Sequence, residues 1–273
     1  MGVNVEIGLG WVYNTDIGFT VDNIKLSEAV LMELNDDERN IQSQYNSMIS
    51  SWPDNNSWYD YTKKVICGFI SANVMISDNM KILNAGSGGS TYGIREEMYH
   101  VDLAERQIKK FPKHYVSSIE HMPFENSFFD LVICVGSVIN YNDALPVISE
   151  ISRVMSPGAK LILEYERSST GELLFKKGYG ENATVQIYDY NGQNNHKLWL
   201  YSDKYIESLL FSADLKVETS KMFHSVSAVY NRIHNNEIKA GRYSSYDSKI
   251  PAFIKKNIAH NRIILCSKGI KGV

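Results

Sequence analysis

A glycine-rich run, NAGSGGS at residues 84–90, lies between two short apolar stretches, and the second of these ends at Asp102. Glycines allow a ligand to approach the backbone closely, and a carboxylate at the end of a strand can accept both hydroxyl groups of a ribose. This combination predicts a site for a nucleoside-type ligand. The alternative is a tight turn followed by a surface aspartate.

The spacing of the glycines distinguishes two classes of nucleotide ligand. The pattern G-x-G-x-x-G is typical of a dinucleotide site, and its third glycine allows a helix to pack tightly against the strand. Thr91 stands at that third position here. The sequence therefore favours a smaller nucleoside ligand over NAD, with Gly86 and Gly88 at the positions of closest approach.

Strands that alternate with helices must position these residues. The patterns predict strands at 81–85, 99–102, 114–119, 128–136 and 159–166, and helices at 58–74, 90–98, 103–111 and 142–155. We therefore expect an α/β fold with a doubly wound, mostly parallel seven-stranded sheet, Rossmann-like, with helices on both faces. In such a sheet the helix after the first strand would point its amino terminus at the crevice.

Beyond Arg167 the alternation is interrupted. Asn191-Gly192 lies between two alternating runs, which is the strongest short-range signal for a β-hairpin. Ser202 is a suitable cap for the helix that follows. The elements expected in this part are the hairpin at 183–202, the helix at 202–215 and two last strands at 215–223 and 261–268.

The expected organisation is one sheet domain with additions. Residues 1–56 should form a helical cap and substrate wall, with a helix over 24–50, and residues 57–273 the Rossmann-like domain. Insertions at about 168–201 and 225–259 are longer than a connection between two elements needs. Insertions at the mouth of an α/β sheet commonly serve as lids or substrate walls, and we expect that role here.

The composition is that of an ordinary globular protein, with 273 residues, 44% hydrophobic and 22% charged. No apolar run approaches the roughly 20 residues that span a bilayer. The amino terminus lacks the patterns of a secretory signal and of myristoylation. The three cysteines are far apart in the sequence and indicate a reducing compartment. We therefore expect a cytoplasmic location and no membrane partner.

The net charge of −3 is unevenly distributed. Residues 1–80 hold 4 basic and 11 acidic side chains, whereas residues 220–273 hold 10 basic and 2 acidic ones. A basic segment of this kind could face a phosphate-bearing substrate. The alternative is that it docks on the acidic amino-terminal segment.

Four motifs between residues 81 and 167 resemble those of one family. ILNAGSGGS resembles its glycine motif and YHVDLAERQI its second motif. SSIEHMPFENSFFDLVICVGSVINY is similar to its signature before the fourth strand, and ISEISRVMSPGAKLILE to the helix, turn and strand that follow. The family is the class I S-adenosylmethionine-dependent methyltransferases, especially the small-molecule, methyltransferase-11-like group. The resemblance implies S-adenosyl-L-methionine as the cofactor.

The same resemblance assigns residues to the cofactor. It places Asp102 on the ribose and Ser118 and Ile119 beside the adenine. Tyr59 and Tyr61, on the helix before the first strand, could reach the cofactor carboxylate, and the alternative is that they are core or surface aromatics. The complete expected set is Asn84, Gly86, Ser87, Gly88, Asp102, Leu103, Ser118, Ile119, Val135, Gly136 and Tyr59, with Val135 and Gly136 along the methionine arm.

Two positions depart from the family pattern. The family usually has an acid where Asn84 stands, which helps to hold the ammonium group of the cofactor. It often has an aspartate where Ser118 stands, which pairs with the adenine amine. A hydroxyl or backbone contact must substitute at the second position.

Fewer residues are expected to be catalytic than to bind the cofactor. The reason is that methyl transfer is an in-line displacement, which depends on holding the nucleophile near the methyl group. A base is needed only when the acceptor is protonated at working pH. The candidates near the expected mouth are Tyr141, Glu164 or Glu166, and His224. Their structural alternatives are lid packing for the tyrosine, strand-edge charges for the glutamates and a hydrogen-bonded strand position for the histidine.

Several other chemistries are disfavoured. No proline precedes a cysteine, as a cytosine-C5 enzyme would need, and GSVINY stands where amino-methylating DNA enzymes resembling this family carry Asn/Asp-Pro-Pro-aromatic. A pI near 6.2 argues against a nucleic-acid partner. No His, Cys and Asp cluster has metal-ligand spacing, so no metal is expected.

The predicted function is S-adenosylmethionine-dependent methyl transfer to an oxygen or nitrogen of a small metabolite. A non-enzymatic binding or scaffold protein on the same fold is the alternative, motivated by Asn84 and Ser118. An NAD-linked oxidoreductase is a third, opposed by Thr91 and the Met-Pro-Phe run. The acceptor and the oligomeric state stay open.

Overall fold

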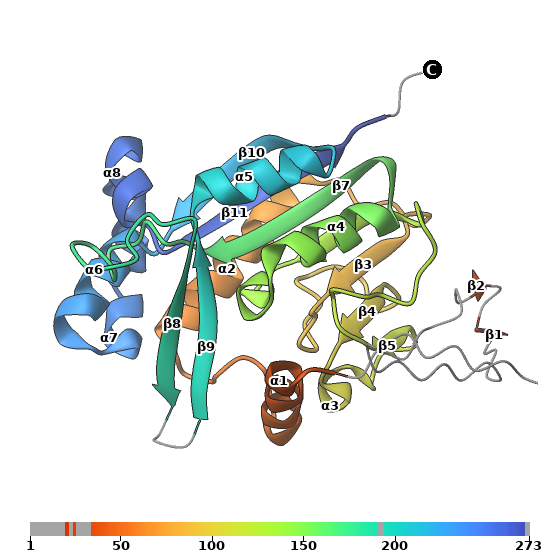
Figure 1. Ribbon diagram of the computed structural model, residues 1–273, viewed down its shortest axis with the longest axis horizontal. Coiled ribbons are helices and arrows are strands. Elements are labelled where there is room, and N and C mark those ends of the chain that lie inside the picture. The colour runs from red at the N-terminus through yellow and green to blue at the C-terminus, as the bar shows by residue number, and fades with distance from the viewer. Residues whose placement is uncertain (1–19, 22–23, 26–33, 191–193, 271–273) are drawn as a thin grey trace, which may run out of the picture.

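A seven-stranded sheet organises the chain, of which the computed structural model describes residues 20–21, 24–25, 34–190 and 194–270 (Figure 1). In spatial order its strands are β10 (Leu215–Phe223), β11 (Asn261–Lys268), β7 (Met155–Glu166), β6 (Phe129–Cys134), β3 (Ile82–Ala85), β4 (Tyr99–Asp102) and β5 (His114–Val116). Strand β11 is antiparallel to both of its neighbours, and the other adjacent pairs are parallel. The predicted doubly wound, mostly parallel sheet is confirmed.

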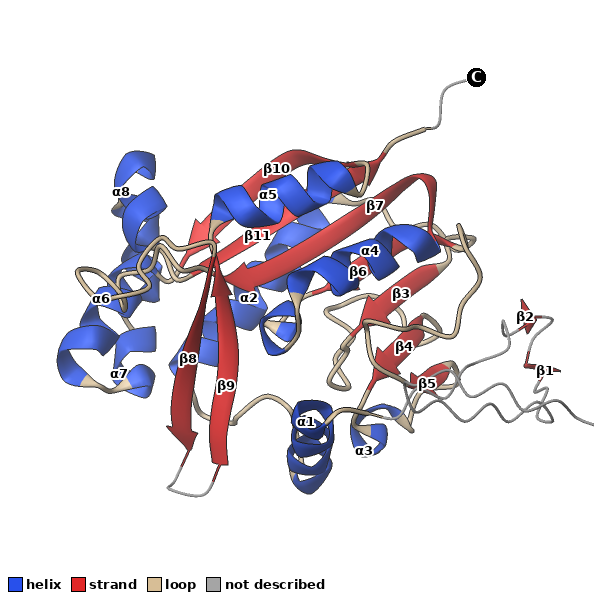
Figure 2. Ribbon diagram, in the orientation of Figure 1, coloured by secondary structure: helices blue, strands red, loops and turns tan. Residues whose placement is uncertain are grey.

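Helices cover both faces of this sheet (Figure 2). Helices α4 (Ala144–Val154) and α5 (Asp203–Ser212) lie on one face, where Ile151 shares an apolar cluster with Val132 of β6. Helix α2 (Ser57–Asn73) lies on the other, where Ile66 shares a second cluster with Ile133. Alternate residues of one strand thus enter different layers, as the period of a strand requires.

The segment between β3 and β4 differs from its prediction. Residues 90–98 form turns instead of the expected helix, with positive φ at Tyr92 (53°) and Gly93 (80°) that breaks a helical path. The helix predicted over 103–111 is reduced to α3 (Glu105–Ile108). No helix amino terminus therefore follows the glycine run, and that expectation is wrong.

The predicted helix over 24–50 is confirmed only in its second half. Helix α1 (Asp36–Ser47) begins at Asn35, whose side chain and that of Glu38 form a reciprocal capping box. Residues 24–25 instead form strand β2 (Ile24–Lys25), paired with β1 (Thr20–Val21). Residues 26–33 of the predicted helix lie outside the described residues.

The two insertions take different forms. Strands β8 (Ala183–Tyr190) and β9 (Asn194–Tyr201) make the predicted antiparallel hairpin, whose Asn191-Gly192 turn lies outside the described residues. The later insertion is helical, with α6 (Ser225–His234), α7 (Glu237–Gly241), the 3-10 helix η2 (Ser244–Lys249) and α8 (Ala252–Ile258). It gathers at one end of the sheet in Figure 1. None of the helices described here is long and apolar enough to cross a membrane.

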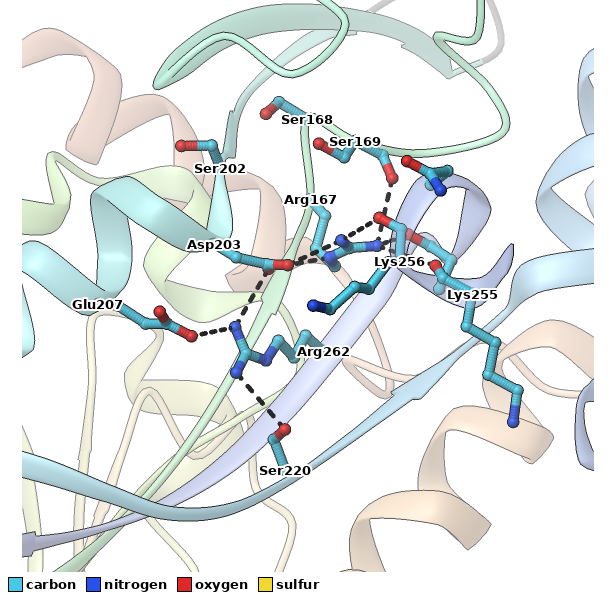
Figure 3. Close-up of polar contacts among 12 residues, drawn as sticks. Arg167, Ser168, Ser169, Ser202, Asp203, Glu207, Ser220, Lys255, Lys256 and Arg262 are labelled. Atoms are coloured by element: carbon cyan, nitrogen blue, oxygen red, sulfur yellow. Dashed lines mark hydrogen bonds and ion pairs between the residues drawn. The ribbon is translucent and has the colours of Figure 1, made fainter. Parts of the chain in front are cut away.

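Arg167, directly after β7, fixes the later insertion to the sheet (Figure 3). Its guanidinium donates to both carboxylate oxygens of Asp203, at 2.8 and 2.9 Å. It also donates to the carbonyl oxygens of Lys256 and Ala259, at 2.8 and 2.7 Å, where α8 ends. A cation at a helix carboxyl terminus is stabilised by the orphan carbonyls there. The chain just beyond α8 is therefore held in place.

Candidate functional site

A cavity of about 260 Å³ lies at the carboxyl ends of β3, β4 and β6. Gly86, Asp102 and Val135, which end or follow these strands, all line it. Helix α1 contributes Tyr45, and the later insertion contributes Glu237. The carboxyl edge of an open parallel sheet is where such folds bind ligands.

The Asp102 carboxylate holds the glycine run in its present shape. Its Oδ2 accepts from the backbone N–H of Gly88 at 2.8 Å, and its Oδ1 accepts from that of Ala104 at 2.8 Å. Burial raises the pKa of this carboxyl, against the lowering effect of the N–H donors. A carboxylate has about four acceptor positions, and the N–H group of Leu103 also acts on this one, so at least one position remains for a ribose hydroxyl group.

The glycines are required where the run turns. Gly86 has φ +70° and Gly88 has φ +51°, in the left-handed region. A Cβ at Gly86 would lie 2.2 Å from the side chain of Val138, and one at Gly88 would lie 2.6 Å from Ser51 Oγ. The backbone N–H groups of Gly86 and Ser87 bond to the carbonyl of Val101, so the run is anchored to β4. Strand pairing, not a helix terminus, positions it.

The turn after β6 is held by a buried carboxylate. Glu164 Oε2 accepts from the N–H groups of Gly136 and Ser137, at 2.9 and 2.7 Å. Its Oε1 accepts from Asn261 Nδ2 at 2.6 Å. Burial raises the pKa of Glu164 to about 7, although these donors oppose the shift. Glu164 is not among the described lining residues, so it positions the turn that lines the cavity.

The structure gathers most of the residues expected to bind the cofactor. The lining includes Gly86, Ser87, Gly88, Asp102, Leu103, Ile119, Val135, Gly136 and Tyr59. Asn84 is buried beneath the run and donates to the carbonyl of Ser90 at 2.8 Å. Ser118 is buried as well, and its neighbour Ser117 reaches the cavity instead. Cofactor contacts for the whole set stay a prediction.

The catalytic candidates separate in the structure. Tyr141 lines the cavity, and its hydroxyl hydrogen-bonds with that of Tyr45 at 2.9 Å. Burial raises the pKa of Tyr141 well above its ordinary value. His224 lies outside the described lining and stacks on Trp58 with ring centroids 3.8 Å apart. Burial lowers the pKa of His224 well below its ordinary value, and Thr62 bonds its Nε2 at 2.8 Å. It is a neutral packing residue.

Sequence reasoning considered Glu166 but missed its neighbours in space. Glu172, Glu237 and His260 also line the cavity, and each comes from a different segment. We call Glu166, Glu172, Glu237 and His260 the glutamate end, and the part around Gly86, Gly88, Asp102 and Gly136 the glycine-loop end. No spacing or motif links Glu166 to the other three residues of the glutamate end, so only the fold reveals those three.

His260 lies between two carboxylates of the glutamate end. Its Nε2 is 3.3 Å from Glu166 Oε2, and its Nδ1 is 3.9 Å from Glu172 Oε2. Burial alone would lower the pKa of His260, but the two glutamates outweigh it and raise the pKa to about 9. The imidazole is therefore charged at neutral pH. Across the described residues, no group of His, Cys, Asp and Glu could hold a metal ion.

Residues 83–163 match the family model for the methyltransferase domain. Curated relatives include the 2-phytyl-1,4-naphtoquinone methyltransferase of Nostoc punctiforme, 29% identical over 39% of this chain and 50% of that protein. Another is the demethylmenaquinone methyltransferase of Bacillus pumilus, 26% identical over 50% of this chain and 62% of that protein. The chain thus spans about half of the length of these relatives.

Solved structures agree on the fold. An S-adenosylmethionine-dependent methyltransferase structure from Listeria monocytogenes has a TM-score of 0.56 at 10% identity, over 76% of this chain and 97% of that one. The geranyl diphosphate C-methyltransferase of Streptomyces coelicolor also has a TM-score of 0.56, at 11% identity, over 86% of this chain and 98% of that one. With the matched domain model and this sheet, the chain carries a methyltransferase domain of the class I, S-adenosylmethionine-dependent type.

Proposed function

We propose that this chain transfers the methyl group of S-adenosylmethionine to an oxygen or nitrogen of a small molecule bound in the same cavity. The observation that carries the proposal is the continuity of one cavity from Asp102 to His260. One end offers the acceptors that a nucleoside needs, and the other offers a separate polar wall. A site for two ligands side by side suits group transfer between them.

The residues at the glycine-loop end fit the cofactor. Asp102 would hold the ribose hydroxyls, Ile119 would pack against the adenine, and Gly86 and Gly136 would leave room for the methionine arm. Their positive φ values, +70° and +85°, fit close approach of a ligand to the backbone. When bound, the cofactor supplies a methyl group on a cationic sulfur, already activated for displacement.

The chain itself supplies position and exclusion of water. Tyr45 and Tyr141 close the cavity from α1 and from the 3-10 helix η1 (Val138–Tyr141), and their hydrogen bond links the two segments. Gln107 Nε2 donates to the carbonyl of Tyr45 at 2.8 Å, so α1 is tied to the sheet domain. Such a wall keeps the nucleophile aligned and dry. Residues 34–56 are thus proposed to act as the substrate wall expected from the sequence.

We also propose a cytoplasmic location for the protein. The three free cysteines support the cytoplasmic location expected from the sequence. The basic side chains Lys255 and Lys256 lie on α8 and are not among the described lining residues. We therefore propose a small-molecule acceptor without assigning these lysines a phosphate contact.

Isothermal titration with S-adenosylmethionine and S-adenosylhomocysteine tests the proposal. We expect saturable binding of both, followed by release of S-adenosylhomocysteine when an acceptor is added. Absence of binding at millimolar cofactor would refute it. Tight cofactor binding without turnover over a broad acceptor library would support the scaffold alternative, which Asn84 and Ser118 motivated.

A further inference from the structure

The glutamate end contains more negative than positive side chains. Glu166, Glu172 and Glu237 stand against the single imidazole of His260. Among the described lining residues there is no lysine or arginine. A ligand bound beside this wall therefore meets an excess of negative charge, which favours a cation and disfavours an anion.

Neighbouring amides orient two of the three carboxylates. Asn231 Nδ2 donates to Glu172 Oε1 at 3.0 Å, and Asn56 Nδ2 donates to Glu237 Oε1 at 2.7 Å. Helix α7, which carries Glu237, packs directly on the start of α2, because a Cβ at Gly241 would lie 2.2 Å from the backbone nitrogen of Trp58. These two carboxylates are thus held by fixed partners and do not extend freely into solvent.

Mutual repulsion persists within this wall. Burial raises the pKa of Glu237, and the charges of Glu172 and Glu166 raise it further. The hydrogen bond from Asn56 and the charge of His260 lower that pKa, but burial keeps it raised. A positive charge bound beside Glu237 would therefore favour its ionised form.

An unpartnered oxygen points independently to a ligand that donates hydrogen bonds. Asn261 is 2% exposed and lines the cavity next to His260. Its Nδ2 donates to Glu164, but its Oδ1 has no hydrogen-bond partner among the described residues. A buried acceptor without a hydrogen bond costs folding free energy. A ligand could supply the donor that this oxygen lacks.

The remaining wall is aromatic. The rings of Trp58 and His260 are T-shaped to each other with centroids 5.5 Å apart, and Trp58 lines the cavity together with Tyr59. Aromatic faces favour the apolar body of a ligand and also a cation held near them. An apolar body with a donor-rich cationic group matches both parts of the wall.

We infer that the methyl acceptor carries a basic amine, bound as an ammonium group by Glu166, Glu172 and Glu237 with its apolar body beside Trp58. This inference rests on the proposed function and narrows its substrate class. It takes the place of the phosphate-bearing acceptor that the basic segment at 220–273 suggested.

Matched probes of opposite charge test it by calorimetry on the chain saturated with S-adenosylhomocysteine. The amines are 2-phenylethylamine, cyclohexylamine and butylamine, and their counterparts are 3-phenylpropionate, cyclohexanecarboxylate and pentanoate. We expect at least one amine to bind and its carboxylate to bind about tenfold more weakly or not at all. In the double variant Glu172→Gln, Glu237→Gln, that amine should lose about tenfold or more in affinity, since charge-assisted bonds are lost.

The control is Glu125→Gln, an exposed glutamate outside the described lining, which should leave amine affinity unchanged. Unchanged affinity of the double variant for S-adenosylhomocysteine would show that its fold and glycine-loop end are intact. Binding of the carboxylates as tight as that of the amines, or no binding of any amine, would overturn the inference. Failure to bind S-adenosylhomocysteine at all would instead refute the proposed function, so the two failures are distinguishable.

Discussion

The glycine-loop end and the glutamate end of the cavity are built in different ways. The first comes from adjacent strand ends, and its parts hold each other through backbone bonds such as Gly88 N–H to Asp102. The second combines Glu166 at the end of β7 and His260 just before β11 with two glutamates from the insertions, and side-chain amides hold those two glutamates. One end is made by strand order alone, and the other joins strand ends to docked insertions.

This difference separates what the domain fold provides from what the insertions add. The backbone contacts at the glycine-loop end follow directly from the parallel order of β3, β4 and β6. Arg167 contributes to the glutamate end, because it binds the carbonyl of Ala259 just before His260. We therefore expect perturbations of the insertion to affect the acceptor and to spare the cofactor.

Replacing Arg167 gives the largest expected effect. Its side chain is 1% exposed and pairs with Asp203, and removal of one partner from a buried pair costs about 3–5 kcal/mol. Arg167→Met should lower the free energy of unfolding by that amount in urea titrations and weaken amine binding. Affinity for S-adenosylhomocysteine should be nearly unchanged in the folded fraction.

The matched control for Arg167 is Lys160→Met, which breaks the partly exposed pair with Glu218 and should cost less than about 1 kcal/mol. Equal losses in the two variants would show that the Arg167 network does not anchor the insertion. A parallel loss of cofactor affinity in Arg167→Met would show that the glycine-loop end and the glutamate end are not independent.

The pH dependence of stability should report the glutamate end next. The folded pKa of His260 is raised from 6.5 to about 9, so the folded state binds more protons in that window. Its stabilising contribution is complete below pH 6.5 and is lost as pH rises through 9, by about 3 kcal/mol. His260→Gln should remove this loss, measured as the free energy of unfolding between pH 7 and 9.

Glu164 supplies the comparison for that experiment. Its pKa is raised from 4.5 to about 7, so its contribution is lost as pH rises from 4.5 through 7, below most of the window of His260. In Glu164→Gln the free energy of unfolding should therefore change less between pH 4.5 and 7, and its decrease between pH 7 and 9 should remain. A loss there that persists in His260→Gln would assign it to another group.

Local patterns found the sheet and the glycine-loop end because both follow from neighbouring residues. The strand periods and the run at 84–90 were sufficient to predict the β3, β4 and β6 edge. The helix predicted over 90–98 failed because the chain turns at Tyr92 and Gly93, where φ is positive. Propensity is a weak prior where the connection is short.

Apart from Glu166, the glutamate end was beyond sequence reasoning for a physical reason. Glu172 and Glu237 lie in insertions without a regular pattern, and they meet His260 only after the insertion docks. Likewise, the burial of Glu164 and His224, which takes both away from the cavity, depends on packing between distant elements. Charge counts over whole segments suggested a basic contact, whereas most of the charged side chains that line the cavity are acidic.

Replacing Asp102 should give an effect confined to the glycine-loop end. Asp102→Ala removes the proposed acceptor of the ribose and the partner of Gly88, and cofactor affinity should fall by about 1.5–3 kcal/mol. Calorimetry with S-adenosylhomocysteine measures it, with the exposed Asp78→Ala as the control. An unchanged affinity with an intact fold would remove Asp102 from the site.

Tyr45 offers the smallest and most discriminating test, because it lies near both ends. Burial raises its pKa, and the charges of Asp102 and Glu166 raise it further, one from each end. Tyr45→Phe keeps the ring against Tyr141, whose centroid is 6.0 Å away, and removes one hydrogen bond. Stability should fall by about 1 kcal/mol, and affinity for amine and cofactor should fall together, each less than in the Asp102 variant.

The control is Tyr246→Phe on the exposed surface of η2, which should change neither affinity. A change in only one of the two affinities would assign α1 to that end and show that the wall it forms is not shared.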